Sequence, residues 1–175
     1  QFGRVSTRFS RPEEAAKRAV RAPRPGHADL AGGLGTDQTA DLRNILERAS
    51  ARETAARVAA GAVCAQILGR FGIRSRAGVL QVGPRQVHAG APDWGLLGRV
   101  RADSPLATPD PDGEEALVEL VREARRRDDT LGGVVGAVVR GLPPGLGSHV
   151  HWDRKLDGRV AQALTSIPSV KAAAI

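Results

Sequence analysis

Aromatic side chains are scarce in this sequence. Its 175 residues include two tryptophans, three phenylalanines and no tyrosine, and methionine is also absent. Proteins that bind single-stranded nucleic acid stack the bases on aromatic rings, so the shortage argues against that class of binding protein. A chain of this length can bury a core, and that core must be built from valine, leucine, isoleucine and alanine.

The sequence has one cysteine, which excludes an intrachain disulfide framework. Cys64 lies among apolar residues of an alanine-rich stretch, and we expect a small buried thiol. No cysteines and histidines have the spacing of a zinc site. No apolar run reaches membrane-spanning length, and the opening residues lack the hydrophobic segment of a signal peptide. We therefore expect a cytoplasmic protein that binds no metal and no membrane.

Lysine is also rare, because 23 arginines and three lysines supply the positive charge behind a net charge of +7. Such a charge attracts anions of any kind, including nucleic acid, membrane headgroups and phosphorylated metabolites. The planar fork of arginine suits bidentate recognition of phosphate and carboxylate. The preference for arginine could equally reflect genome composition, and the charge alone does not choose among these ligands.

The run from Arg48 to Gly61, RASARETAARVAAG, carries the best site signal in the chain. Ser50 and Glu53 have the spacing of a capping box, which predicts a helix from residue 51 to about residue 71. A helix N-terminus flanked by Arg48 and Arg52 could also bind a phosphate. Simple capping explains the same spacing, and both interpretations stay open here.

The remaining pattern predicts an α+β fold without internal repeats. A punctuated loop is expected over residues 21–40, and residues 84–112 read as a surface excursion anchored by Trp94, Leu96 and Leu97. His149 and His151 are expected to be structural loop residues. Other helices are predicted over 12–20, from 114 to the arginines at 125–127, and behind an Asp153 cap with the core stripe Leu156, Val160, Leu164 and Ile167; strands are predicted over 73–82, within 131–140 as a buried valine-rich strand, and from 170.

Three segments resemble chorismate synthase, the flavin-dependent enzyme that closes the shikimate pathway. The run described above resembles the family's arginine-serine-arginine-glutamate signature. RPGHADLAGGL at 24–34 resembles its histidine loop, and residues 126–164 resemble its central strand, turn and helix. Because these matches occur in family order across most of residues 12–171, the chain is identified as a member of that family.

Two parts of the family pattern are not found. The Gly-Glu-Ser-His-Gly motif that opens the family and the flavin-binding half with its catalytic aspartate are both missing, so residues 1–175 are expected to form a partial domain, an internal fragment of a longer enzyme. Residues 35–40, GTDQTA, stand where the family usually has a Lys-Tyr-Gly or Lys-Phe-Gly step. We therefore expect an altered geometry in that loop.

The resemblance implies a sandwich of helices between antiparallel sheets, assembled as a homotetramer. It implies a 1,4-elimination of phosphate from 5-enolpyruvylshikimate 3-phosphate, with reduced FMN as cofactor and NADPH as a candidate source of electrons for the flavin. His27 matches the loop histidine and is the expected catalytic acid. Arg48, Ala49 and Ser50 match the flavin-contacting tripeptide, commonly Arg-Ser-Ser.

Two residues near His27 have roles that the sequence leaves open. Asp29 could orient the imidazole or form a turn. Arg24 could meet a substrate anion or be a solvated loop residue.

Two other functions remain compatible with the sequence. The chain could be a non-catalytic piece or degenerate paralogue that acts at most in assembly with intact subunits. It could also bind nucleic acid through its arginines, which would give a steep salt dependence. Interspersed acids and few aromatics make the nucleic-acid function the least favoured, and no nucleic-acid partner is expected.

Overall fold

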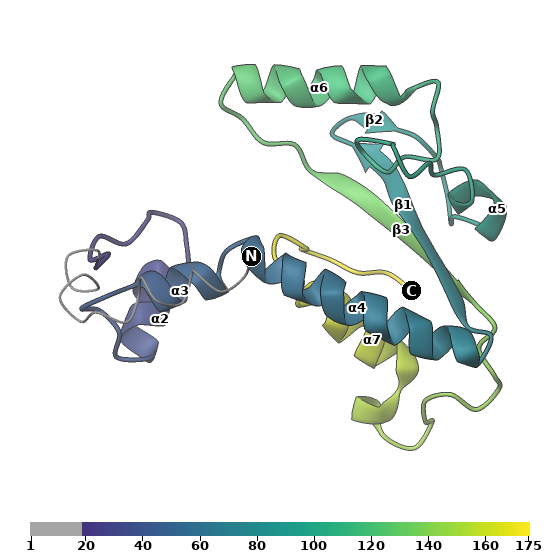
Figure 1. Ribbon diagram of the computed structural model, residues 1–175, viewed down its shortest axis with the longest axis horizontal. Coiled ribbons are helices and arrows are strands. Elements are labelled where there is room, and N and C mark those ends of the chain that lie inside the picture. Colours follow the sequence, from purple (N-terminus) through teal and green to yellow (C-terminus); the bar gives the residue numbers. More distant parts are fainter. Residues whose placement is uncertain (1–18) are drawn as a thin grey trace, which may run out of the picture. The chain divides into compact units, whose positions relative to one another are not determined.

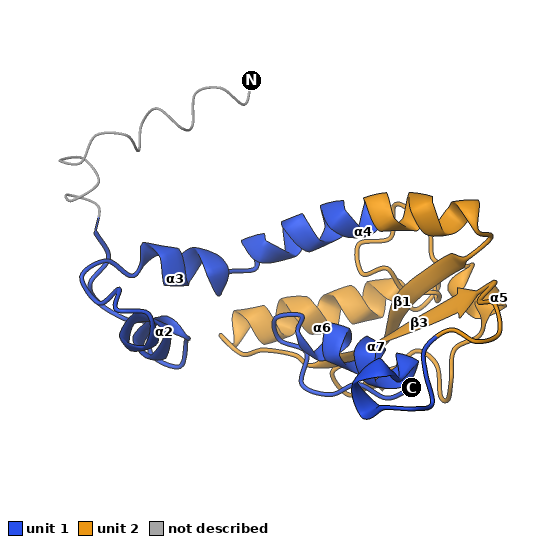
Figure 2. Ribbon diagram, turned by 90° about the horizontal axis from the view of Figure 1, so that it is seen from below, with its two compact units in different colours: residues 1–62, 147–175 blue, residues 63–146 orange. Residues whose placement is uncertain are grey.

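The computed structural model describes residues 19–175, so the helix predicted over 12–20 lies almost wholly outside the described residues. The chain divides into two compact units, residues 1–62 with 147–175 and residues 63–146 (Figure 2). Each unit is described separately below. Helix α4 (Arg52–Arg70) begins in the first unit and ends in the second.

The second unit contains an antiparallel sheet of β1 (Arg74–Val82), β2 (Arg85–Gln86) and β3 (Gly133–Arg140) in the order β2-β1-β3 (Figure 1). The long pairing of β1 with β3 confirms the strands expected over 73–82 and 131–140. The expectation that β3 is buried is wrong, because most of its residues are exposed. The side chains of Val134, Val135 and Val139 are between 47% and 71% exposed.

The segment from residue 84 to residue 112 contains β2 and the short helix α5 (Trp94–Leu97). Asp93 caps α5, since its carboxylate accepts a hydrogen bond from Leu96 N at 2.7 Å. The side chain of Leu97, one of the three expected anchors, is 2% exposed. The Val79 amide donates to Ala107 O at 2.9 Å, so the segment is fastened directly to β1.

Helix α6 (Glu114–Arg126) confirms the helix predicted from residue 114, with acids in its first turn and arginines in its last. These charges complement the helix dipole. Leu117 is fully buried, and the carboxylate of Glu114 accepts hydrogen bonds from Ser104 Oγ and Leu106 N. The buried aliphatic residues of this unit are Ile73, Leu80, Val82, Leu97 and Leu117.

In the first unit, α2 (Asp29–Gly35) and α3 (Arg43–Arg48) lie in contact. The expectation of an irregular loop over residues 21–40 is wrong for residues 29–35, because α2 forms across three glycines, and holds for the residues on either side. A Cβ on Gly32 would lie 2.6 Å from Ile45 Cγ2, and one on Gly33 would lie 2.5 Å from Leu42 Cδ2. The glycines lower intrinsic helix stability, but they allow close packing of α3 on α2.

The start of α4 confirms the helix predicted behind Ser50. The predicted capping box, in which Ser50 and Glu53 would each bind a backbone amide at the helix start, is wrong. Ser50 Oγ accepts from Arg52 N at 3.3 Å, while the Glu53 carboxylate accepts from Arg57 Nε at 2.7 and 2.9 Å. The many small side chains of this segment predict a helix that neighbours approach closely and bury. That prediction is wrong, because the helix has no buried residue. Cys64 is exposed, so the expectation of a buried thiol is wrong. An alanine-rich face permits a neighbour to pack closely but does not supply one.

The C-terminal part of the first unit begins its helix later than predicted. A 3-10 turn, η2 (Trp152–Arg154), precedes α7 (Leu156–Thr165), and the extended Lys155 separates them. Asp153 does not cap α7, because its carboxylate is 2.8 Å from His151 Nδ1. No strand forms over residues 170–175, so that expectation is wrong. Helices with a small antiparallel sheet confirm the α+β class.

Candidate functional site

A cavity of about 300 Å³ lies within the first unit and is bordered by three arginines. Arg24 precedes α2, Arg43 opens α3, and Arg52 opens α4. Three consecutive parts of the chain therefore bring a positive charge to one place. The lining residues are Val20, Arg24, Arg43, Leu46, Glu47, Ser50 and Arg52.

Arg24 is held by Asp29, which is fully buried. Arg24 Nε donates to Asp29 Oδ2 at 2.9 Å, Nη2 donates to Oδ1 at 3.0 Å, and the Arg24 amide also donates to Oδ2 at 2.9 Å. These hydrogen bonds lower the pKa of Asp29 to about 2. The carboxylate therefore stays charged near neutral pH and fixes the guanidinium beside the cavity in a bidentate geometry.

Arg43 is paired with Asp41 in a similar way. Arg43 Nε lies 3.0 and 2.9 Å from the two carboxylate oxygens, and the Val20 amide donates to Oδ1 at 3.3 Å. Hydrogen bonds from Arg43 lower the pKa of Asp41 to about 2. Both aspartates lie outside the cavity lining, so they orient their arginines without filling the space that the arginines border.

The third arginine, Arg52, pairs with Glu47, and both side chains are more than half exposed. Glu47 also lines the cavity and supplies its one negative charge. With three guanidinium groups, one carboxylate and the Ser50 hydroxyl at its border, the cavity has donors suited to a phosphate or carboxylate ligand.

His27 lies in the loop before α2 and is exposed. Its Nδ1 is 2.9 Å from Pro25 O, and a carbonyl oxygen can only accept, so Nδ1 carries the hydrogen. Nε2 is then the ring atom that can take up or release a proton. The hypothesis that Asp29 orients the imidazole is wrong, since Pro25 O does so while both Asp29 oxygens bind Arg24.

The predicted flavin-contacting residues lie at the end of α3. Arg48 is the last residue of that helix and is exposed, and it forms no ion pair within residues 19–175. The Ala49 amide donates to Ile45 O at 2.9 Å and is therefore committed to the helix. Ser50 reaches the cavity lining, whereas His27, Arg48 and Ala49 do not.

Sequence reasoning missed Arg43 and its partner Asp41. The signal that could have found them is the short Asp-Leu-Arg sequence at the start of a helix, where the acid accepts hydrogen bonds from both the amide and the guanidinium of the arginine. Arg52, which flanks the predicted helix N-terminus in the sequence, lines the cavity. Arg24 lines it as well, so it is not simply a solvated loop residue.

Comparison with known proteins shows which family this chain belongs to. The family model for chorismate synthase matches residues 7–175. The chain belongs to the chorismate synthase family. It is 58% identical over 160 residues to chorismate synthase of Moorella thermoacetica, covering 91% of this chain and 41% of that protein. It is 54% identical over 157 residues to the enzyme of Thermus thermophilus, covering 89% and 40%.

A solved crystal structure of chorismate synthase has the same fold over much of the chain. It superposes with a TM-score of 0.75 at 43% sequence identity and covers 83% of this chain and 46% of that one. The present member of the chorismate synthase family thus spans about two fifths of the length of the curated relatives that it matches.

Two further findings concern residues 19–175 alone. None of their helices combines the length and apolar character needed to cross a bilayer. Their histidine, cysteine and acidic side chains form no group of three that could coordinate a metal ion.

Proposed function

We propose that the chain supplies part of the active site of a chorismate synthase, which eliminates phosphate from 5-enolpyruvylshikimate 3-phosphate with reduced FMN as cofactor. The observation that carries the proposal is the cavity lined by Arg24, Arg43, Arg52 and Ser50. Its donors suit the phosphate and carboxylates of such a substrate. His27 belongs to the loop that precedes α2 and to the same unit.

Two of the three residues at the end of α3 have groups that could bind an anionic cofactor. Arg48 is an exposed guanidinium without an ion pair in the described chain, and Ser50 offers a hydroxyl. Ala49 contributes neither a hydroxyl nor its amide, because the amide is bound to Ile45 O. We propose that Arg48 and Ser50 hold the phosphate-bearing part of FMN. When bound, reduced FMN supplies transient electron density as the carbon–oxygen bond to phosphate breaks.

The proposed role of His27 follows from its tautomer. With Nδ1 donating to Pro25 O, a protonated ring presents its second hydrogen at Nε2. That hydrogen is the one an exposed imidazole can donate as a general acid beside the cofactor. Arg24 and Arg43, oriented by Asp29 and Asp41, would stabilise the negative charge that collects on the departing phosphate.

Anaerobic phosphate release from 5-enolpyruvylshikimate 3-phosphate tests the proposal. The purified chain is mixed with chemically reduced FMN beside the active Thermus thermophilus enzyme. Release by the wild-type chain that His27→Ala abolishes supports the proposed chemistry. Binding of FMN is measured in parallel by fluorescence, and Arg48→Ala is expected to weaken it, with Arg159→Ala in α7 as the matched control. If His27→Ala released phosphate as fast as the wild-type chain and Arg48→Ala bound FMN as tightly, the assigned roles would be refuted.

A second candidate is a chain that binds the ligands but does not turn over by itself. The chain spans about two fifths of its curated relatives, and this observation favours it. Weak FMN binding without phosphate release would then be the result. Restored release on mixing with an intact family member that lacks the histidine matching His27 would show that the chain contributes its site within an assembly.

The assembly, location and electron source of the whole enzyme are proposed from the resemblance to the family. We expect a cytoplasmic homotetramer that takes a small phosphorylated substrate, with NADPH as a candidate source of electrons for the flavin. Binding to nucleic acid is not expected. Sedimentation at two salt concentrations, with and without DNA, measures both the assembly and any salt-dependent association.

A further inference from the structure

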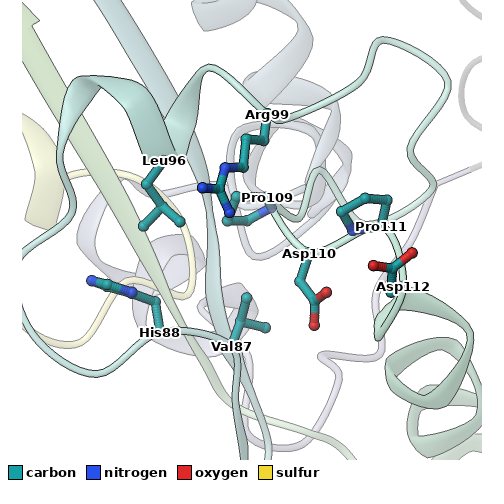
Figure 3. A pocket seen from close by; sticks show the side chains of 8 residues that line it. All are labelled: Val87, His88, Leu96, Arg99, Pro109, Asp110, Pro111 and Asp112. Carbon is teal, nitrogen blue, oxygen red and sulfur yellow. The ribbon is translucent and has the colours of Figure 1, made fainter.

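A second cavity, of about 450 Å³, lies within the sheet unit. Its volume is in the usual range for small-molecule sites. It is separate in sequence from the arginine cavity and plays no part in the function proposed above. Charged groups of both signs line it together with apolar side chains and two prolines (Figure 3). The side chains that matter here are Val87, His88, Leu96, Arg99, Asp110 and Asp112.

The charged groups of this cavity do not neutralise one another. Arg99 forms no ion pair with any residue of 19–175, although it borders the same space as Asp110 and Asp112. It acts at longer range on the carboxylate of Asp93, which does not line the cavity. Asp110 Oδ1 accepts from Gly113 N at 3.1 Å, which orients the carboxylate. By contrast, the nearby Arg101 is paired with Asp103 at 3.2 Å and does not line the cavity.

The walls of the cavity are held in place by contacts outside it. The Ala107 carbonyl accepts from Val79 N of β1 at 2.9 Å, which fixes the loop that leads to Asp110. On the other side, the Asp93 cap holds α5 and with it Leu96. In Figure 3 the Arg99 side chain lies between those of Leu96 and Asp110. Opposite charges are thus presented by two braced loops with an apolar surface beside them.

We propose that this cavity binds a small zwitterion, an α-amino acid with an aliphatic side chain. Its carboxylate would bind Arg99, its ammonium group would bind Asp110 and Asp112, and its side chain would contact Leu96 and Val87. A simple anion would be repelled by the two aspartates, and a simple cation by Arg99. A ligand with both charges satisfies each group, since charge-assisted hydrogen bonds form at both ends.

Titration of the ¹⁵N-labelled chain with L-leucine tests the proposal by NMR. Saturable shifts at the amides of Leu96, Arg99 and Asp112 are expected, and three probes are run beside leucine. These are 4-methylpentanoate, which lacks the ammonium group, isoamylamine, which lacks the carboxylate, and inorganic phosphate. Each is expected to bind at least about tenfold more weakly than leucine, because one charged contact is lost or opposed. Equal or tighter binding of any of the three would overturn the zwitterion proposal.

Variants locate the site. Arg99 and Asp112 are exposed, and their side chains form no hydrogen bond or ion pair in the described chain, so Arg99→Gln and Asp112→Asn are expected to fold. Each should weaken leucine binding about tenfold or more, whereas Arg101→Gln, the matched control, should leave it unchanged. No saturable leucine binding to the wild-type chain, or unaltered binding to both variants, would contradict the proposal. These outcomes are independent of FMN binding and phosphate release, so the two proposals can fail separately.

Discussion

Between residues 19 and 50, two arginine–aspartate pairs tie the chain to itself, whereas the sheet unit is centred on five buried aliphatic side chains. In the first region the fully buried side chain is the carboxylate of Asp29, beside the buried Leu42. In the sheet unit Leu117 and Thr108 are fully buried, and the single buried carboxylate, that of Glu114, lies among a majority of aliphatic side chains. Burial of a charge contributes little net stability but fixes the direction of its partner. Burial of an aliphatic side chain contributes stability directly. We therefore expect the arginine–aspartate pairs to orient guanidinium groups at the cavity, and the aliphatic core of the sheet unit to contribute more of the stability.

The largest effect is expected from Leu117→Ala in α6. Removing a fully buried leucine should lower the free energy of unfolding by about 2–5 kcal/mol, because a cavity is left behind. Urea denaturation followed by tryptophan fluorescence measures it. The control is Val121→Ala on the same helix, whose side chain is 40% exposed. Equal losses in both variants would show that Leu117 is not part of a stabilising core.

A smaller loss is expected from Gly133→Ala at the start of β3. A Cβ there would lie 2.5 Å from Gln81 O, so the two strands would have to separate locally. We expect a loss of about 1–3 kcal/mol, typical of overpacking. The neighbouring Gly132 has no atom within 4 Å of its position for a Cβ, and Gly132→Ala is the matched control. The pairing seen here would be in doubt if both variants unfolded at the same urea concentration.

Acid should affect the polar region through Asp29. The pKa of Asp29 is lowered from 3.8 to about 2 by its hydrogen bonds with Arg24, so the folded state binds fewer protons than the unfolded state. The resulting stabilisation is present above about pH 4 and is lost as the pH falls through about 2. In Asp29→Asn this part of the acid dependence should be absent. Thermal unfolding followed by circular dichroism at pH 4.5, 3.5 and 2.5 measures the difference.

Asp41→Asn is the parallel case, because the pKa of Asp41 is also lowered to about 2. It should remove a separate part of the same acid dependence, and the double variant should remove both. An Asp29→Asn chain with the full acid dependence of the wild type would contradict the pairing with Arg24.

The sequence predicted the positions of β1, β3 and α6 well because local pattern and tertiary structure agree there, although it did not predict β2 or the exposure of β3. Valine-rich strands and an acid-first, arginine-last helix need no distant partner to be recognised. It failed over residues 29–35, since glycines that are typical of helix breakers become contact points once α3 packs on α2. The expected burial of α4 failed for a related reason. Small side chains permit a neighbour to pack closely, but they do not show that a neighbour is present. Within residues 19–175 no residue of α4 is buried.

The candidate site could be predicted only in part. Family resemblance singled out His27, Arg48, Ala49 and Ser50, and of these only Ser50 lines the cavity. Arg24, which the sequence left open because it lies near His27, lines the cavity as well. Arg43 could not be singled out, because one arginine among 23 has no distinguishing local pattern until Asp41 is seen to bind it. Spacing alone also could not show that Asp29 binds Arg24 and leaves His27 to Pro25.

The smallest effect on stability is expected from Glu47→Gln at the arginine cavity. Glu47 and Arg52 form an exposed pair, and such pairs contribute about 0–1 kcal/mol to stability. Removing this negative charge should nevertheless raise the affinity of the cavity for inorganic phosphate by about two- to fivefold, because Coulomb repulsion of the anion is relieved. Calorimetric titration measures the affinity, and urea denaturation measures the stability. The control is Glu123→Gln, because Glu123 and its partner Arg127 both lie in the sheet unit, apart from the arginine cavity. If phosphate affinity stays unchanged while stability falls by more than about 1 kcal/mol, the upper end for an exposed pair, then Glu47 belongs to the stabilising framework and the contrast between the two regions fails at this residue.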